Sequence, residues 1–591
     1  MAQESVNLTI ARQQVMDKQY DAAQKMYAQL YDTRPFDKSL YKEYLDVLLE
    51  LKLYDEANIL IDRMILIRRQ DVSLLVDKGV VWKLQNPKKA KQNPYFEEVY
   101  TKVVADEYAT RQLADALVRA NEYEWAIKVL EKVGNNIYNM PTFFSKELAV
   151  LYGQMGNTDK AINATLDIIE GNVRQLNEVK ESLLTLIKDD DKKYQYTLKQ
   201  LDNRIQANSN SVAGFVLLKV WMYTFKNNYQ GALEIIIDYD KMMDNSGNQV
   251  LGFVKMATEE SQYDIAIEGT KYIMSLGRSS FVFEKANEDN LLLRYEQLKR
   301  AVGNTTELIN PLQQDFKTFF TTFPEYYGAP IIRSYAQFVA YYLHQVDTAI
   351  HILEASLQAP NNSRENKAWS KIDLGDYYLL KGAIWDATLI YSQVEKDFKQ
   401  DFIGEQARFR NAQLAYFNQD FEWAQAQLKV LKAATSDLIA NDALNLSLLI
   451  TENVAPMDTA KTLLKQYAQA DLFVFQNKLT QADSILSVIQ DAEKDAPIID
   501  NVLKLRAEIA LKQNNPKLAI SYLQALLEAF ADEVLADDAL FMMATIYEQQ
   551  LKDKKNAALY YEKIITDYAG STFLQQARIR YAALQNASKS L

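Results

Sequence analysis

Apolar and polar positions alternate along this chain with the three- and four-residue spacing of amphipathic helices, and the pattern repeats about every 34 to 38 residues. It is clearest between residues 369 and 431, where a helix with Gly375 is followed by a turn and a helix with Ala387 and Tyr391. Two antiparallel helices touch along their length only where one offers a small side chain and the other a large one. The pattern therefore predicts stacked helix pairs, with Gly375 and Ala387 on the small side of one contact.

One alanine in each second helix marks the position of its pair. In the first half of the chain these marker alanines are 34 or 35 residues apart, or about twice that distance. The two wider gaps predict divergent helix pairs near residues 79–90 and 179–201. In the second half the steps are 37 or 38 residues, with one step of 58 residues. The marker alanines are Ala23, Ala57, Ala126, Ala161, Ala232, Ala266, Ala349, Ala387, Ala424, Ala482, Ala519 and Ala557.

Glycine and proline interrupt the pattern between residues 276 and 330, for example at Gly277, Pro324 and Pro330. We interpret this segment as an irregular helical break or hinge, although one long helix pair with an insertion fits the sequence equally well. The predicted organisation is an N-terminal array over 1–275, the break over 276–330, and a C-terminal array over 331–591 that ends in a polar capping helix.

The order Leu374-Gly375-x-x-Tyr378, followed by Ala387-x-x-x-Tyr391, resembles the helix–turn–helix unit of tetratricopeptide repeats. The last unit is similar to the repeats of periplasmic scaffold proteins of Gram-negative bacteria. The resemblance implies an all-α fold, a tetratricopeptide-repeat α-solenoid in which antiparallel helix pairs form a right-handed superhelix. It also implies a non-enzymatic scaffold that mediates protein–protein interaction.

The composition agrees with this fold and removes several function classes. Only 17 Gly and 11 Pro occur in 591 residues, which favours helix pairs joined by short loops. With 66 basic and 78 acidic residues the formal net charge is −12, so we expect no nucleic-acid partner. The chain has no Cys, and its two histidines, His344 and His351, lie on either side of a predicted turn. We therefore expect no metal site and no cofactor.

Motifs of known catalytic or nucleotide-binding sites, such as a phosphate-binding loop or an H-E-x-x-H helix, are absent from the sequence. Because the repeat pattern assigns nearly every segment to a helix pair, we predict that the protein is not an enzyme and has no small-molecule substrate. A helical carbohydrate-active enzyme is a third hypothesis. It requires a deeply set carboxylate pair in the groove, within about 10 Å.

No apolar run reaches the roughly 18 residues of a membrane-spanning helix, so we expect no membrane span. The first residues, Met1-Ala2-Gln3-Glu4, resemble the mature end of an exported bacterial protein with a methionine added back. We expect a periplasmic protein whose signal peptide is removed, docked as a subunit to an outer-membrane assembly, secretion or uptake complex. A cytoplasmic adaptor or co-chaperone is the alternative.

The first helices of such pairs line the concave face of the solenoid, and several of their predicted groove positions are aromatic. Buried Tyr and Trp anchors often carry ~2 kcal/mol or more of binding energy when a partner covers them. We therefore predict a groove for an extended or helical peptide segment, although stacking on the next pair explains the same aromatic residues. The predicted partner-binding residues are Phe338, Tyr341, Tyr342, Trp369, Asp376, Phe409, Gln413, Tyr416 and Phe417.

Overall fold

The computed structural model describes residues 2–69, 71–103, 106–207, 211–243, 246–301, 305–399, 401–432, 437–454, 458–492 and 496–589. Over these residues the regular elements are thirty-two α-helices and six short 3-10 or π-helical segments, and no strand is present. Most consecutive helices pack against each other. The predicted all-α tetratricopeptide-repeat solenoid is thus the observed fold.

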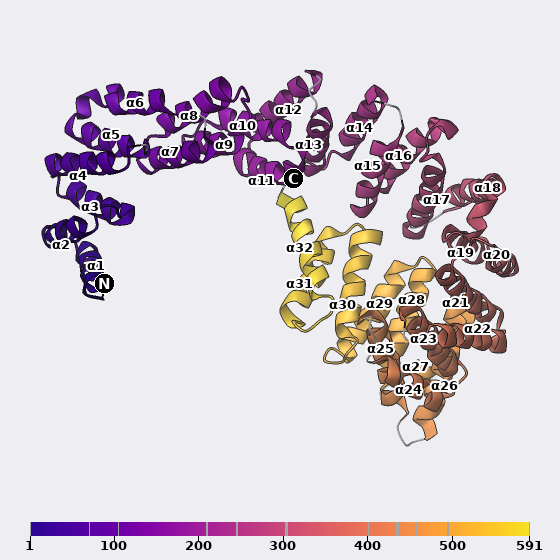
Figure 1. Cartoon of the computed structure of the whole chain (residues 1–591). Coiled ribbons are helices and arrows are strands. Elements are labelled where there is room, and N and C mark those ends of the chain that lie inside the picture. Colours follow the sequence, from indigo (N-terminus) through magenta and orange to yellow (C-terminus); the bar gives the residue numbers. More distant parts are fainter. Residues whose placement is uncertain are drawn as a thin grey trace. The chain divides into compact units, whose positions relative to one another are not determined.

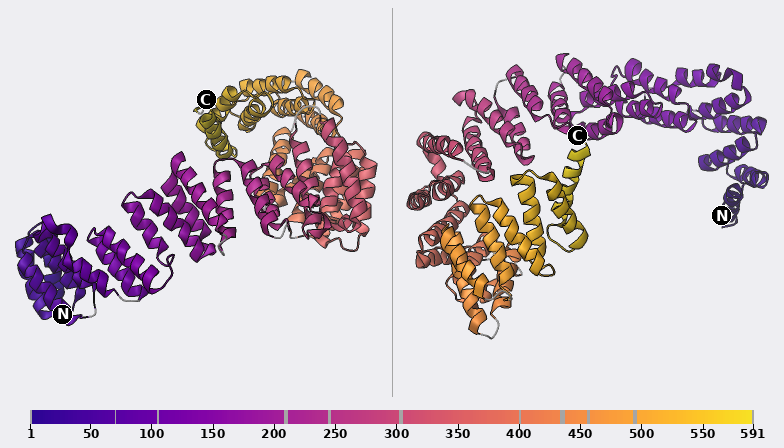
Figure 2. Two further views of the ribbon diagram at one scale, coloured as in Figure 1. Left: turned by 90° about the horizontal axis from the view of Figure 1, so that it is seen from above. Right: turned by 180° about the vertical axis from the view of Figure 1, so that it is seen from behind.

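The chain divides into two compact units, Met1–Asp244 and Asn245–Leu591. Within each unit the helices follow one another as stacked antiparallel pairs (Figure 1, Figure 2). The first unit contains α1 (Ala2–Met16), α2 (Tyr20–Thr33), α3 (Lys38–Glu50), α4 (Tyr54–Ile67), α5 (Ser73–Gln85), η1 (Pro87–Gln92), α6 (Pro94–Lys102), α7 (Glu107–Arg119), α8 (Tyr123–Glu131), η2 (Lys132–Ile137), α9 (Ser145–Gln154), α10 (Thr158–Gly171), η3 (Val173–Gln175), α11 (Leu176–Ile187), α12 (Asp191–Gln206), α13 (Val212–Phe225) and α14 (Tyr229–Met243).

The second unit is longer and continues the same arrangement. It contains α15 (Asn248–Glu259), α16 (Tyr263–Ser275), η4 (Gly277–Ser279), α17 (Phe283–Arg300), α18 (Thr306–Thr322), η5 (Pro324–Gly328), α19 (Ile331–Tyr341), α20 (Val346–Gln358), α21 (Arg364–Lys381), α22 (Ile384–Asp397), α23 (Phe402–Phe417), α24 (Phe421–Leu431), α25 (Asp437–Asn453), α26 (Asp458–Phe475), α27 (Leu479–Ala492), α28 (Ile499–Lys512), α29 (Pro516–Ala529), α30 (Ala536–Thr545), η6 (Ile546–Gln550), α31 (Lys554–Asp567) and α32 (Leu574–Lys589).

A residue with positive φ joins the two helices of each marked pair, five positions before the marker alanine. At Gln419, with φ of 63°, the Gln419 N–H donates to the Tyr416 carbonyl oxygen, and the next N–H donates to that of Ala415, each at 2.9 Å. These bonds satisfy the last carbonyls of α23 and turn the chain back. The twelve marker alanines have no exposed surface, which confirms the repeat positions predicted from the sequence. The turn residues are Lys18, Lys52, Asn121, Gly156, Asn227, Ser261, His344, Gly382, Gln419, Asn477, Asn514 and Lys552.

The predicted close contact at Gly375 is confirmed. A Cβ atom on Gly375 would lie within 3 Å of the ring of Tyr391, which is fully buried on α22. The same device joins α5 and α6, where Gly79 faces the ring of Phe96. This pair and the pair of α11 and α12 are the two divergent units that the wide alanine gaps predict.

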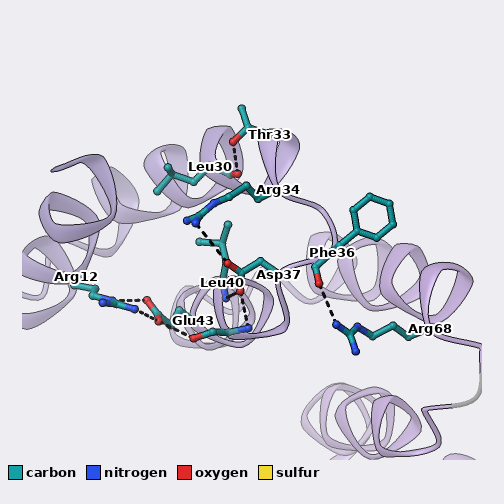
Figure 3. A network of polar contacts seen from close by, with 10 residues as sticks. Arg12, Leu30, Thr33, Arg34, Phe36, Asp37, Leu40, Glu43 and Arg68 are labelled. Carbon is teal, nitrogen blue, oxygen red and sulfur yellow. Dashed lines mark hydrogen bonds and ion pairs between the residues drawn. The ribbon is translucent and has the colours of Figure 1, made fainter. Parts of the chain in front are cut away.

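Polar contacts also tie neighbouring pairs together, as Figure 3 shows for the start of the first unit. The Arg12 guanidinium on α1 donates to both carboxylate oxygens of Glu43 on α3, at 2.9 and 2.6 Å. The Arg68 guanidinium donates to the carbonyl oxygen of Phe36 at 3.2 Å. Exposed ion pairs contribute at most ~1 kcal/mol each. The buried apolar contacts between helices therefore provide most of the stability.

Residues 276–330 hold the long helices α17 and α18, which is the helix-pair alternative that the sequence left open. Residues 302–304, between these two helices, lie outside the described residues. The boundary between the two compact units falls at Asp244 and Asn245 and not near residue 275. A hinge at 276–330 stays a prediction.

The step of 58 residues between Ala424 and Ala482 contains an additional helix, α25, ahead of the pair α26 and α27. The end of α26 then returns to earlier helices. The Gln476 side-chain amide donates to the carbonyl oxygen of Leu379 at 3.0 Å, across 97 positions of sequence. The ring of Phe475 lies 6.0 Å from that of Phe417. Here the solenoid has contacts beyond its nearest neighbours.

Candidate functional site

Four consecutive first helices of the second unit, α17, α19, α21 and α23, line a hollow of about 520 Å³, which we name the inner hollow. Each helix contributes residues three or four positions apart, so that each presents one face. The predicted groove on the first helices therefore exists at this point of the fold. Its lining residues are Tyr295, Lys299, Arg333, Gln337, Tyr341, Tyr342, Trp369, Ile372, Asp373, Asp376, Gln406 and Arg410.

The structure brings four of the nine predicted partner-binding residues to the inner hollow, namely Tyr341, Tyr342, Trp369 and Asp376. Tyr341 keeps 45% of its surface exposed, and Trp369 and Tyr342 are partly exposed. These three rings are therefore accessible to a partner. Their role in partner binding stays a prediction.

The other five residues lie outside the inner hollow. Gln413 is partly buried, and its side-chain oxygen accepts a hydrogen bond from Arg410 at 3.3 Å. The remaining four are core side chains, because aromatic residues of a first helix also fill the space between stacked pairs. Stacking, the alternative explanation, describes Phe338, Phe409, Tyr416 and Phe417.

Two arginines that the sequence reasoning missed give the inner hollow its charge. The Arg333 guanidinium donates to both oxygens of the buried Asp373 carboxylate, at 2.6 and 3.1 Å. The same guanidinium lies 5.1 Å from the ring centroid of Trp369, within range of a cation–π interaction. The available signal was the spacing, because Arg333 precedes Asp373 by 40 positions, about one repeat.

Arg410 forms the second ion pair of the inner hollow. Its Nε lies 3.1 Å from Oδ1 of the buried Asp376. The same oxygen accepts a hydrogen bond from the Tyr391 hydroxyl at 2.5 Å. Asp376 therefore links three elements, since Tyr391 comes from α22 and Arg410 from α23. A buried, partnered carboxylate of this kind fixes the orientation of its guanidinium.

Burial raises the pKa of both Asp373 and Asp376, while the facing guanidinium groups of Arg333 and Arg410 act in the opposite direction. The two aspartates lie three positions apart on α21 and so share one face, as a carboxylate pair for glycoside hydrolysis requires. Each is held by an arginine, however, which leaves neither as a free acid or base. The arrangement is that of a recognition surface with aromatic faces, two fixed guanidinium groups and the side-chain amides of Gln337 and Gln406.

Across the residues that the structure describes, no group of three or more His, Asp or Glu side chains is placed to hold a metal ion. Over the same ranges, no helix combines the length and the apolar character needed to cross a membrane.

The comparison with protein families matches residues 538–571 to the model of the tetratricopeptide repeat. This segment is a tetratricopeptide repeat. It includes most of α30, all of η6 and α31, and the turn residue Lys552, five positions before the fully buried Ala557. The other marked pairs repeat this turn and buried alanine, so this tetratricopeptide repeat is representative of the array.

A search of curated proteins finds no sequence match to this chain. Among solved structures, the chain is similar to "Structure of Naa15/Naa10 bound to HypK-THB" at 12% identity and a TM-score of 0.26, covering 100% of this chain and 97% of that chain. It is similar to the structure of the hetero-tetramer Cut9-Hcn1 of APC/C at 11% identity and a TM-score of 0.21, over 98% and 96%. It is also similar to the tetratricopeptide-repeat domain of P58(IPK) at 14% identity and a TM-score of 0.19, over 71% and 99%. Likenesses at these scores carry no argument about function.

Proposed function

We propose that the protein is a non-enzymatic scaffold that binds a polypeptide segment of a partner protein in the inner hollow. The observation that carries this proposal is the alignment of accessible aromatic rings with fixed guanidinium groups on four consecutive first helices. Tyr, Trp and Arg are the residues that most often dominate the energy of protein interfaces. Tyr341, Trp369 and Arg333 supply all three types within one hollow.

The form of the inner hollow suits a peptide better than a small molecule. Its residues come from helices spread over more than a hundred positions of sequence, and each helix contributes only two to four side chains. Stacked helices stand about 10 Å apart. A ligand that touches all four must therefore extend over roughly 30 Å, which a polypeptide segment of about nine residues does when extended.

We further propose that this scaffold is periplasmic and belongs to an outer-membrane assembly, secretion or uptake complex. The support for this proposal is the resemblance of the last repeat to those of envelope scaffolds, together with the absence of Cys from the sequence. A cytoplasmic adaptor or co-chaperone uses the same inner hollow and is the alternative.

The test is a pull-down from the envelope and cytoplasmic fractions of the source cell, with the native protein and a Tyr341→Ala, Trp369→Ala variant. Both side chains have exposed surface, so the helical content should be unchanged by circular dichroism. We expect an envelope protein to be retained by the native chain and lost with the variant. A Tyr108→Ala variant, which removes an exposed ring of the first unit, is the matched control and should retain the partner.

Equal retention by the native chain and the double variant would overturn the inner hollow as the binding site. Partners recovered only from the cytoplasmic fraction would overturn the periplasmic proposal and favour the adaptor.

A further inference from the structure

A second hollow, of about 610 Å³, lies on the opposite kind of surface, between the second helices α22 and α24, with α23 as its floor. We name it the outer hollow. No residue of the inner hollow lines it. Its lining residues are Ile384, Trp385, Thr388, Ser392, Glu395, Lys396, Lys399, Arg408, Asn411, Leu414, Ala415, Asn418, Asp420, Trp423 and Gln427.

Two exposed tryptophans stand at one end of the outer hollow. Trp385, near the start of α22, is 81% exposed, and Trp423, near the start of α24, is 55% exposed. Trp125 occupies the position equivalent to Trp423 in the first unit, one before its marker alanine, and is buried in the core. Exposed indole rings gain free energy when a ligand covers them, and such rings are typical of binding hot spots.

The floor of the outer hollow is polar and contains an unused acceptor. Asn411 is only 9% exposed, and its amide nitrogen donates to Glu395 at 3.0 Å. Among the described residues its amide oxygen has no hydrogen-bond partner. Glu395 is also bound by Arg408 at 3.0 Å, which fixes this floor. A buried acceptor without a partner costs free energy, so a ligand with an N–H or O–H group would be stabilised here.

The far end of the outer hollow is basic. Lys396 and Lys399 line it near the end of α22, 11 and 14 positions after Trp385. At a rise of 1.5 Å per helical residue these lysines lie roughly 16–21 Å from the tryptophan along the helix axis. An extended polypeptide covers this distance in about five or six residues.

We propose that the outer hollow binds an extended polypeptide segment of a partner protein. An apolar side chain of the segment lies between Trp385 and Trp423, and a backbone N–H donates to the Asn411 amide oxygen. An acidic side chain five or six residues away pairs with Lys396 and Lys399. A neutral saccharide would stack on the indole rings as well, but it would leave the two lysines without a role. This inference does not depend on the inner hollow.

The test selects ligands from a phage library of random twelve-residue peptides on the immobilised full-length protein. We expect the enriched peptides to share an apolar and an acidic residue at a spacing of five or six. Fluorescence anisotropy of the best labelled peptide should then show an affinity at least about tenfold weaker for a Trp385→Ala, Trp423→Ala variant. A Lys396→Glu, Lys399→Glu variant should select basic residues at the same spacing.

Two variants separate this site from others on the protein. Phe281→Ala removes an exposed ring distant in sequence from the outer hollow and should leave peptide affinity unchanged. Tyr341→Ala, Trp369→Ala should also leave it unchanged, because those residues belong to the inner hollow. Peptides that bind the Trp385→Ala, Trp423→Ala variant as tightly as the native chain, or no enrichment at all, would overturn the proposal. Binding on a saccharide array that this variant abolishes, without peptide binding, would replace the peptide by a glycan.

Discussion

Gly375 and Gly252 lie in helices of the same unit, yet the space around them differs completely. A Cβ atom on Gly375 would collide with the buried ring of Tyr391, whereas a Cβ atom on Gly252 would meet nothing within 4 Å. The first glycine is needed for close packing of α21 on α22. The second, exposed on α15, only lowers the stability of its helix.

We predict opposite effects of the same substitution at these two positions. Gly375→Ala should lower the free energy of unfolding by about 1–3 kcal/mol, because the ring of Tyr391 must move. Gly252→Ala should raise it by up to ~1 kcal/mol through helix propensity. Urea denaturation followed by circular dichroism measures both changes. An unchanged midpoint for Gly375→Ala would contradict the register of this pair.

Asp471 on α26 is a carboxyl group whose burial, together with the nearby Glu508, raises its pKa to about 7. The ordinary value is 3.8. Between these two values the folded protein therefore holds a proton that the unfolded chain releases. The free energy of unfolding should fall as the pH rises from about 4 to 7, and the stabilisation is absent above that range.

We predict that Asp471→Asn removes this loss. Since Asp471 keeps some exposure to solvent, the variant should be more stable than the native protein at pH 8 by about 1–3 kcal/mol and nearly equal to it at pH 4. Urea titrations at both pH values provide the measurement. Glu268→Gln, on the exposed face of α16, is the control and should not change the pH dependence. A constant difference between Asp471→Asn and native protein at both pH values would argue against this role.

At the residue scale the sequence predicts the type of site better than its members. Tyr341 and Trp369 lie at the inner hollow, but Phe338 and Tyr416 occupy equivalent helices and are fully buried. An aromatic residue on a first helix faces either the groove or the next pair, and a rotation of a few tens of degrees decides which. The repeat pattern does not define that rotation, whereas contacts between pairs do.

At the scale of elements, the helix pair is predictable because its signal is local. A small residue in the second helix and a turn five positions earlier are both defined within one repeat, as Ala424 and Gln419 illustrate. Elements that break the period are not predictable in this way. The helix α25 has no marker alanine and appears in the sequence only as a step that is too long.

The turn between paired helices allows a prediction that depends on backbone strain alone. Gly382 has φ of 82°, and a Cβ atom placed there would meet nothing within 4 Å. Gly382→Ala should nevertheless cost about 1 kcal/mol, because left-handed backbone is unfavourable for a side chain with Cβ. Gln419→Gly, at the equivalent turn of the next pair, should stabilise by up to ~1 kcal/mol.

Thermal denaturation of both variants provides the test. A Gly382→Ala variant as stable as the native protein would show that this turn relaxes without cost.

At the scale of the whole molecule, each hydrophobic core belongs to one compact unit. The clusters around Leu45, Leu117 and Leu201 lie in Met1–Asp244, and those around Phe338 and Leu428 lie in Asn245–Leu591. Helix stacks of this kind transmit stability mainly to their nearest neighbours.

We therefore predict that damage to the first unit stays there. In Gly79→Ala the new methyl group would collide with the Phe96 ring, and the exchange of amide hydrogens should become faster in α5 to α8. Protection in α21 to α28 should remain at the native level. Hydrogen exchange with mass spectrometry resolves the two regions. Equal loss of protection throughout the chain would contradict this separation.

The hydrogen bond from Gln476 to Leu379 has a mechanical consequence. Most helix pairs, pulled from the chain ends, would detach one after another, each releasing a short length of polypeptide. The residues between Leu379 and Gln476 are fastened together, with the Phe417 and Phe475 rings beside the fastening. Under tension this segment should resist until that contact breaks and then yield as one block, extending by roughly 300 Å in a single event.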